Sequence, residues 1–211
     1  MSCPLCQQRK PKRFCPAAAE KICAVCCGTY REVTMDCPAD CQHLVAARRY
    51  DREHRETLNA AEIPYPEIRV SPERIAEREE VIVLAGRALA AAARELRATD
   101  ADAIAALAAM VETYRTLESG IYYERAPESH AARQLYAELA KALADYKKAQ
   151  AERIGFAALK DAEALELLVF LLRLGKRETS GRPRSRAFLD YLRASLGVTE
   201  PQPESTRILM P

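Results

Sequence analysis

Between residues 71 and 197, the apolar side chains recur at the spacing of α-helices. Ser71 followed by Pro72 gives a helix start, with an N-cap residue and a proline at the first helical position. The positions after it repeat every seven residues: Ile75, Ile82, Leu89 and Leu96. Because alanines lie between them, we expect one long helix whose narrow seam packs inside a bundle or against a second copy of the chain.

Three further amphipathic helices and one apolar helix follow in the predicted bundle. Leu165 to Leu174 is apolar on almost every side, which predicts the most buried helix, with Gly175 at its end. The amphipathic helices are expected from Thr99 to Ser119, from Pro127 to Gly155, and through the residues that precede Gly197. The pattern indicates an all-α bundle of about five helices.

Residues 44–70 connect this bundle to the amino-terminal segment. Leu44 to Leu58 alternates acidic and basic side chains at i,i+4 spacing, which predicts a mostly solvated helix. The stretch Ile63-Pro64-Tyr65-Pro66 cannot continue a helix and predicts a linker. At the other end of the chain, residues 198–211 contain three prolines, and we expect a disordered tail there.

The first 43 residues lack helical periodicity and carry all eight cysteines of the 211-residue chain. The cysteines are Cys3, Cys6, Cys15, Cys23, Cys26, Cys27, Cys37 and Cys41, and His43 follows the last of them. No apolar run resembles a signal peptide or is long enough to cross a bilayer. We therefore expect a cytoplasmic protein, whose clustered thiols bind metal rather than form disulfides.

The spacing of these cysteines indicates two zinc sites. Cys3/Cys6 and Cys23/Cys26 are C-x2-C pairs, in which one tight turn brings two thiolates to the same tetrahedral ion. The two pairs would complete one four-cysteine site, and Cys15, Cys27, Cys37 and Cys41 would complete a second in alternating, cross-brace order. His43 is a ninth candidate that could replace Cys41 or Cys27, so the ligand pairing stays open.

Zinc also explains how so short a segment can fold. Residues 1–43 hold few large apolar side chains and cannot form a stable core by burial alone. Each structural zinc contributes on the order of 10 kcal/mol of apparent binding free energy. The predicted fold class is therefore an all-α helical bundle with a small N-terminal zinc-binding module of the treble-clef or cross-brace kind. The predicted domains are residues 1–43, 44–70, 71–197 and 198–211.

Residues 3–43 resemble the compact two-zinc cross-brace fingers of the HIT, MYND and B-box type. The resemblance rests on the two C-x2-C pairs and on the closing Cys37-x3-Cys41-x-His43, and it covers about a fifth of the chain. It implies a protein-interaction module with structural zinc. The sequence departs from these fingers at Cys15, which stands alone where a paired ligand is expected. The layout with a helical remainder is also similar to bacterial cysteine-rich proteins that have no assigned activity.

The charge pattern weighs against nucleic acid as the main partner. The formal net charge of the chain is +2, and residues 1–43 hold six basic and four acidic side chains. Eight thiolates with two Zn²⁺ would add four negative charges to that segment. The basic side chains would then offset metal–thiolate charge rather than attract phosphate.

We therefore expect a non-enzymatic adaptor or regulatory protein that acts through protein–protein contacts and binds two Zn²⁺. Sites with four thiolate ligands leave no open position for water or substrate, which argues against an enzyme. A nucleic-acid-binding protein is the alternative, and a redox or zinc-release sensor comes next. The densest basic run, which could contact nucleic acid or another anion, lies at a loop-to-helix junction. It consists of Arg182, Arg184 and Arg186.

Overall fold

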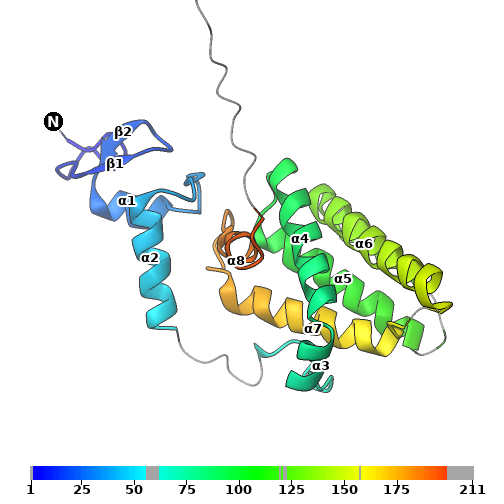
Figure 1. Cartoon of the computed structure of the whole chain (residues 1–211). Helices are drawn as coiled ribbons and strands as arrows, with labels where there is room; N and C mark the ends of the chain where they lie inside the picture. Colours follow the sequence, from blue (N-terminus) through cyan, green and yellow to red (C-terminus); the bar gives the residue numbers. More distant parts are fainter. Residues whose placement is uncertain (1, 56–61, 119, 121–122, 157, 199–211) are drawn as a thin grey trace, which may run out of the picture.

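The computed structural model describes residues 2–55, 62–118, 120, 123–156 and 158–198. Within these ranges, eight helices and a two-stranded hairpin form a small amino-terminal module and a helical bundle (Figure 1). The predicted fold class of a helical bundle with a small cysteine-rich module is confirmed. All but the first residue of the predicted tail lies outside the described residues. In the part of the chain that the structure describes, none of the helices has the length and apolar character needed to span a membrane.

The amino-terminal module runs in the order hairpin, short helix, longer helix. The two strands pair antiparallel, with Arg13 opposite Ile22. These strands and the first helix are not predicted by the sequence, because elements of three to seven residues are too short to display a period. The elements are β1 (Arg13–Cys15), β2 (Glu20–Ile22), α1 (Ala24–Tyr30) and α2 (Gln42–Glu53).

Helix α2 is the predicted charged helix, but one of its faces is covered. Arg49 forms the expected i,i+4 pair with Glu53 at 2.9 Å. Arg55, in contrast, lies 3.4 Å from Glu178 of the bundle. Arg48 is only 15 % exposed. The expectation of a mostly solvated helix is therefore wrong for this face, since its partners are distant in sequence.

The bundle contains six helices, one more than expected. They are α3 (Pro72–Glu77), α4 (Glu79–Glu95), α5 (Asp100–Glu118), α6 (His130–Ile154), α7 (Asp161–Glu178) and α8 (Ala187–Ser195). The predicted start at Ser71 is confirmed, because its Oγ accepts the backbone N–H of Arg74 at 3.1 Å. The seam of α4 packs within the bundle, where Ala85, Leu89 and Ala93 are buried.

The single long helix expected from Ser71 to Leu96 is interrupted at Arg78. Arg78 donates to the carboxylate of Glu163 at 3.0 Å, and Arg74 donates to the same carboxylate at 2.8 Å. Glu163 lies in the first turn of α7 and is buried. The break thus accompanies two ion pairs with one acidic side chain, which a hydrophobic repeat cannot reveal.

Helix α7 is the central helix, as its apolar run predicts. Leu167, Leu168 and Leu171 are fully buried, and α7 packs against α4, α5 and α8. The predicted end at Gly175 is wrong, because α7 continues to Glu178. A Cβ at Gly175 would lie 3.1 Å from the ring of Phe188 and 3.2 Å from Ile104, so this glycine allows close packing rather than ending the helix.

A buried carboxylate joins the starts of α5 and α8. Asp100 accepts the hydroxyl of Ser185 at 2.7 Å and the backbone N–H groups of Phe188 and Leu189, both at 3.2 Å. It is 1 % exposed. Asp100 therefore satisfies free N–H groups at the start of α8 and fixes the end of the loop that follows α7.

That loop joins the amino-terminal module to the bundle. Arg182 donates to the backbone carbonyls of Gly28 and Arg31 at 2.9 and 2.6 Å, at the carboxyl end of α1. Glu32, which is buried, accepts from Arg48 at 2.7 Å and from Ser180 at 3.2 Å. The junction is therefore polar, and positive charge meets the negative end of a helix dipole.

Candidate metal centre

Four thiols converge beside the start of α1. The Sγ atoms of Cys3, Cys6, Cys23 and Cys26 all lie within 4.8 Å of one another, and those of Cys6 and Cys23 are 3.9 Å apart. Tetrahedral zinc with bonds of about 2.3 Å requires sulfur atoms about 3.8 Å apart. The group could therefore bind a single metal ion, with the four ligands predicted for the first site. All eight cysteines of the chain are free thiols.

The local backbone places these thiols. A tight turn after Cys3, closed by the N–H of Gln7 donating to the Cys3 carbonyl at 2.7 Å, brings Cys6 back toward it. The N–H of Cys23 donates to Cys3 Sγ at 3.3 Å, and the N–H of Cys26 donates to Cys23 Sγ at the same distance. Such N–H···S bonds orient the sulfur atoms and stabilise their thiolate form.

The thiols differ in how readily they ionise. The backbone N–H groups of Gln8 and Arg9 lower the pKa of Cys6 to about 6. Burial, together with the neighbouring thiols, raises the pKa of Cys26 to about 12. Four thiolates this close repel one another, so their full ionisation requires a cation among them. A metal ion would therefore displace protons from the group, and its affinity would fall with decreasing pH.

The other four cysteines gather around a second, smaller space. Cys15, Cys27, Cys37 and Cys41, with His43, line a cavity of about 10 Å³, which is the room one small ion or water needs. Among the described residues, however, the first four cysteines are the sole group of three or more potential ligands whose atoms approach within 4.8 Å. The structure thus assembles one predicted site to ligand distance and brings the residues of the other into one neighbourhood.

Two groups in this neighbourhood have shifted pKa values. Burial raises the pKa of Cys37, and negative charge on Cys41 and Cys15 raises it further. A hydrogen bond with the Glu32 backbone opposes this rise in part. Burial and the charges of Arg13 and Arg31 lower the pKa of His43. A lowered pKa keeps His43 neutral, which is the form in which imidazole binds metal.

Two of the three arginines predicted to contact anions have protein partners. Arg182 binds the end of α1, as described above. Arg186 pairs with Asp36 at 2.5 Å and donates to the carbonyl of Ala98 at 3.2 Å. Arg184 is exposed, and its side chain has no hydrogen bond or ion pair within the described ranges.

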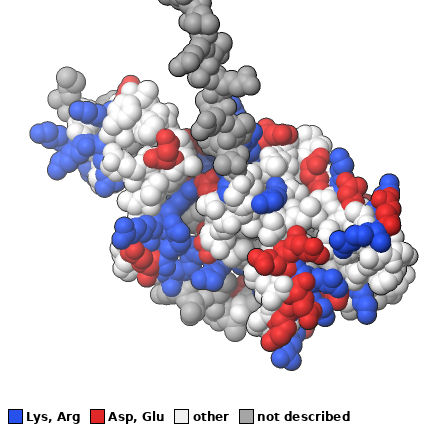
Figure 2. All heavy atoms as spheres, in the orientation of Figure 1, with Lys and Arg blue, Asp and Glu red and all other residues white. Residues whose placement is uncertain are grey.

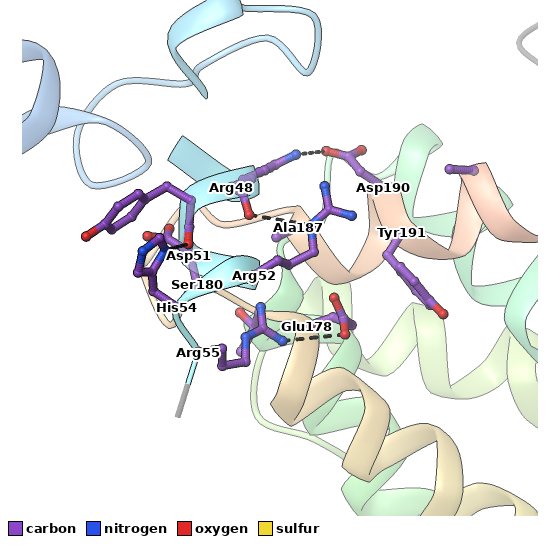
Figure 3. A pocket seen from close by; sticks show the side chains of 13 residues that line it. Arg48, Asp51, Arg52, His54, Arg55, Glu178, Ser180, Ala187, Asp190 and Tyr191 are labelled. Atoms are coloured by element: carbon purple, nitrogen blue, oxygen red, sulfur yellow. Dashed lines mark hydrogen bonds and ion pairs between the residues drawn. The ribbon is translucent and has the colours of Figure 1, made fainter. Parts of the chain in front are cut away.

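Ion pairs that the sequence analysis did not identify line a cleft of about 450 Å³ between α2 and α8 (Figure 3). Arg48 lies 2.6 Å from Asp190 on one side, and Arg55 lies 3.4 Å from Glu178 on the other. The partners are more than a hundred residues apart in sequence, so no local spacing could have shown them. These pairs attach α2 to the bundle.

The fold and the site together define a helical-bundle protein with an amino-terminal four-cysteine module that could bind one metal ion. No protein-family model, curated protein or solved structure matches the chain. The resemblance to HIT, MYND and B-box fingers therefore depends on the spacing of the cysteines.

Proposed function

We propose that this chain is a zinc-stabilised, non-enzymatic adaptor that acts through protein–protein contacts of its amino-terminal module. The observation that supports this is the distribution of exposed large apolar side chains. Seven of the eleven such residues in the described part of the chain belong to the first 55 positions, which are about a quarter of the sequence. They are Leu5, Phe14, Val25, Tyr30, Val33, Val45 and Tyr50. Exposed apolar patches mark interaction sites.

Part of this apolar surface forms a groove, which we call the α2 groove. Two shallow hollows of about 460 and 640 Å³ share Asp40 and Gln42 and are therefore continuous. Phe14, 55 % exposed, lies at one end, and Tyr50, 60 % exposed, lies at the other. The remaining apolar residues of the groove are Pro16, Pro38, Val45 and Ala46. A partner segment with two large apolar side chains would bury both ends of this groove.

In this proposal the metal is zinc, and there are two ions. Tetrahedral thiolate sites select zinc or iron–sulfur clusters, and zinc suits a role without electron transfer. The first ion would bind Cys3, Cys6, Cys23 and Cys26. The second would bind Cys15, Cys27, Cys37 and Cys41, with His43 as the alternative ligand. Support for the second ion comes from the ion-sized cavity that these residues line.

Zinc would serve adaptor function by holding the α2 groove in shape. Phe14 of the groove precedes Cys15 in β1, and Pro38 and Asp40 lie between Cys37 and Cys41. Metal bonds at these cysteines would fix the two segments that carry Phe14 and Pro38–Asp40. Because four protein ligands leave no open position on the ion, zinc would contribute structure rather than chemistry.

Site-specific photo-crosslinking tests the proposal. A photoreactive residue replaces Val45 in the α2 groove, and a matched one replaces Ile154, an exposed residue at the end of α6. In native lysate, we expect position 45 to yield a discrete protein adduct that position 154 does not. Phe14→Asp in the same chain should remove that adduct, since a charge at an apolar interface is costly to desolvate.

The result that contradicts the proposal is a similar set of adducts from both positions, or one that Phe14→Asp leaves intact. Adducts that disappear on nuclease treatment would instead favour a nucleic-acid partner. Phe156→Asp, at another exposed apolar residue of the bundle, is the control for the added charge.

A further inference from the structure

A second cleft, of about 320 Å³, lies where the amino-terminal module meets α4, α8 and the loop between α7 and α8. We call it the arginine cleft. Its charged lining consists of six arginines and three acids, which gives a net charge of +3. The arginines are Arg48, Arg94, Arg97, Arg184, Arg186 and Arg193, and the acids are Glu32, Asp36 and Asp190. Figure 2 shows basic side chains concentrated where the module faces the bundle.

The positive charge of the arginine cleft resides on three side chains. The three acids of the cleft already form ion pairs with three of its six arginines. Glu32 pairs with Arg48, Asp36 pairs with Arg186, and Asp190 pairs with both Arg48 and Arg193. The other three arginines are exposed and have no ion pair within the described ranges. They are Arg94, Arg97 and Arg184. Three guanidinium groups without counter-charges at one cleft attract an anion.

Arg97 lies in the turn that ends α4. Arg97 follows the end of α4 with a φ of 51°, the left-handed conformation that usually takes glycine at this position. Arginine is less favourable than glycine in this conformation, because its Cβ lies too close to the backbone. The conformation belongs to the turn that ends α4, in which the N–H of Ala98 donates to the Ala93 carbonyl at 2.9 Å and the N–H of Arg97 donates to the Arg94 carbonyl at 3.3 Å. Arg186 also donates to the Arg97 carbonyl, at 3.2 Å. This cap fixes the backbone of Arg97 at the end of α4, beside the cleft.

We propose that the arginine cleft binds a small phosphate-bearing anion. The planar, forked guanidinium group can donate to two oxygens of one phosphate. Two of the three free arginines come from α4 and its end, and the third comes from the loop before α8. The ligand would thus connect separate elements of the bundle next to the docked module. This proposal does not depend on the adaptor function.

The lining of the cleft favours a small ligand over a nucleic-acid strand. None of its lining residues is aromatic, so it offers no surface on which bases could stack. Its basic residues also surround one hollow instead of following an extended groove. Recognition would therefore be of the phosphate groups, with little contribution from an attached base.

Isothermal titration calorimetry of the metal-loaded full-length protein with inorganic phosphate, pyrophosphate and ADP tests the inference. We expect pyrophosphate to bind more tightly than phosphate, and ADP to bind no more tightly than pyrophosphate. Added salt should weaken all three, since the attraction is between exposed charges. Metal content is measured after each titration, because pyrophosphate also binds zinc.

The variant Arg97→Gly separates binding from folding. Glycine suits the backbone at this position, so thermal stability should stay equal or rise, while pyrophosphate affinity should fall about tenfold. The triple variant Arg94→Ala, Arg97→Gly and Arg184→Ala should abolish measurable binding. The matched control replaces three exposed basic residues outside the cleft by alanine and should bind as the wild type does. These are Arg69, Lys141 and Arg153.

Three results would overturn the inference. The first is that the triple variant and its charge-matched control lose pyrophosphate affinity equally. The second is binding of single-stranded RNA or DNA in the absence of any binding of the three small anions. The third is loss of metal from the triple variant with phosphate affinity retained, which would mean that these arginines offset metal–thiolate charge.

Discussion

The interiors of the two parts of this molecule are built from different residues. In the bundle, the buried cluster consists mainly of leucine, alanine and valine side chains, most of them from helices α4 to α8, with Phe188 and Met110 among the largest. In the module, the buried cluster consists of five cysteines and Ile22. One interior is held by apolar surface shared among many residues, and the other is a group of thiols that a metal ion could hold together through bonds to a few atoms.

This difference predicts different responses to damage. Loss of one buried leucine removes a fraction of the apolar contacts of the bundle, and the remaining contacts still support the fold. If a metal ion holds the module together, loss of one thiolate should disrupt the coordination on which the whole module depends.

Removal of the metal should unfold the module and leave the bundle folded. Metal binding contributes on the order of 10 kcal/mol to such modules, far more than burial of Ile22 can replace. In chelator-treated, reduced protein, we expect amide hydrogen exchange to become fast in residues 3–41 and to remain slow in α5 and α7. Added zinc should restore protection. Slow exchange around Cys26 without metal would show that the module folds by burial.

A cavity in the bundle should have a smaller effect. It should destabilise the bundle and leave metal binding by the module unchanged. Leu168 is 2 % exposed at the centre of α7. Leu168→Ala should lower the free energy of unfolding by about 3 kcal/mol, which urea denaturation followed by circular dichroism measures. Metal stoichiometry should be unchanged. Val45→Ala, at an exposed residue of the module, is the control and should change stability little.

The same contrast explains how much of the molecule the sequence predicts. Helical periodicity predicts the bundle, because a leucine every three or four residues is a direct consequence of one buried face. The C-x2-C pairs predict the four thiols that converge in the candidate metal site, because chelation by a tight turn fixes that spacing. Both signals are local, and each reflects the residues that stabilise its own part of the fold.

Contacts between distant residues are not predicted. The break in the long helix accompanies ion pairs of Glu163 with Arg74 and Arg78, which lie 89 and 85 residues away. Gly175 is a site of close approach to Phe188 rather than a helix end. In each case the reason lies in the tertiary neighbour, and no spacing along the chain encodes it.

Substitution of Asp100 shows how strongly the bundle holds the loop between α7 and α8, which contacts the module. Asp100→Ala removes a buried acceptor of three hydrogen bonds and should destabilise the bundle by about 2 kcal/mol in urea denaturation. Asp100→Asn keeps one acceptor oxygen and should lose less. Equal losses in the two variants would show that the negative charge, rather than hydrogen bonding, accounts for the effect.

Substitution of Arg182 shows whether the amino-terminal module and the bundle stabilise each other. Arg182→Ala removes both hydrogen bonds to the end of α1 and should cost about 1 kcal/mol in the metal-loaded protein. In the metal-free protein, α1 is expected to be unfolded, so the same substitution should cost nothing. Urea denaturation in both states measures the difference. An equal loss with and without metal would place the contribution of Arg182 inside the bundle.

The smallest expected effect is a pH dependence confined to the bundle. Burial acts to raise the pKa of Asp102, but hydrogen bonds from the Thr99 backbone N–H and the Ser129 and Thr99 hydroxyls outweigh it and lower the pKa below its ordinary value of 3.8. Because the pKa is lower in the folded state, Asp102 stabilises the fold above the unfolded pKa, and this contribution is lost as the pH falls through the folded pKa.

Asp102→Asn should therefore reduce stability by about 0.5 kcal/mol at neutral pH, a modest value because the group is partly solvated. The difference from the wild type should shrink as the pH falls below 3.8. Thermal unfolding of the metal-free, chelator-treated protein measures this difference in stability without interference from metal release. Glu138→Gln, at an exposed residue of α6, is the control. A difference between Asp102→Asn and the wild type that stays constant with pH would mean that the effect is independent of the carboxylate charge and reflects the loss of an acceptor oxygen.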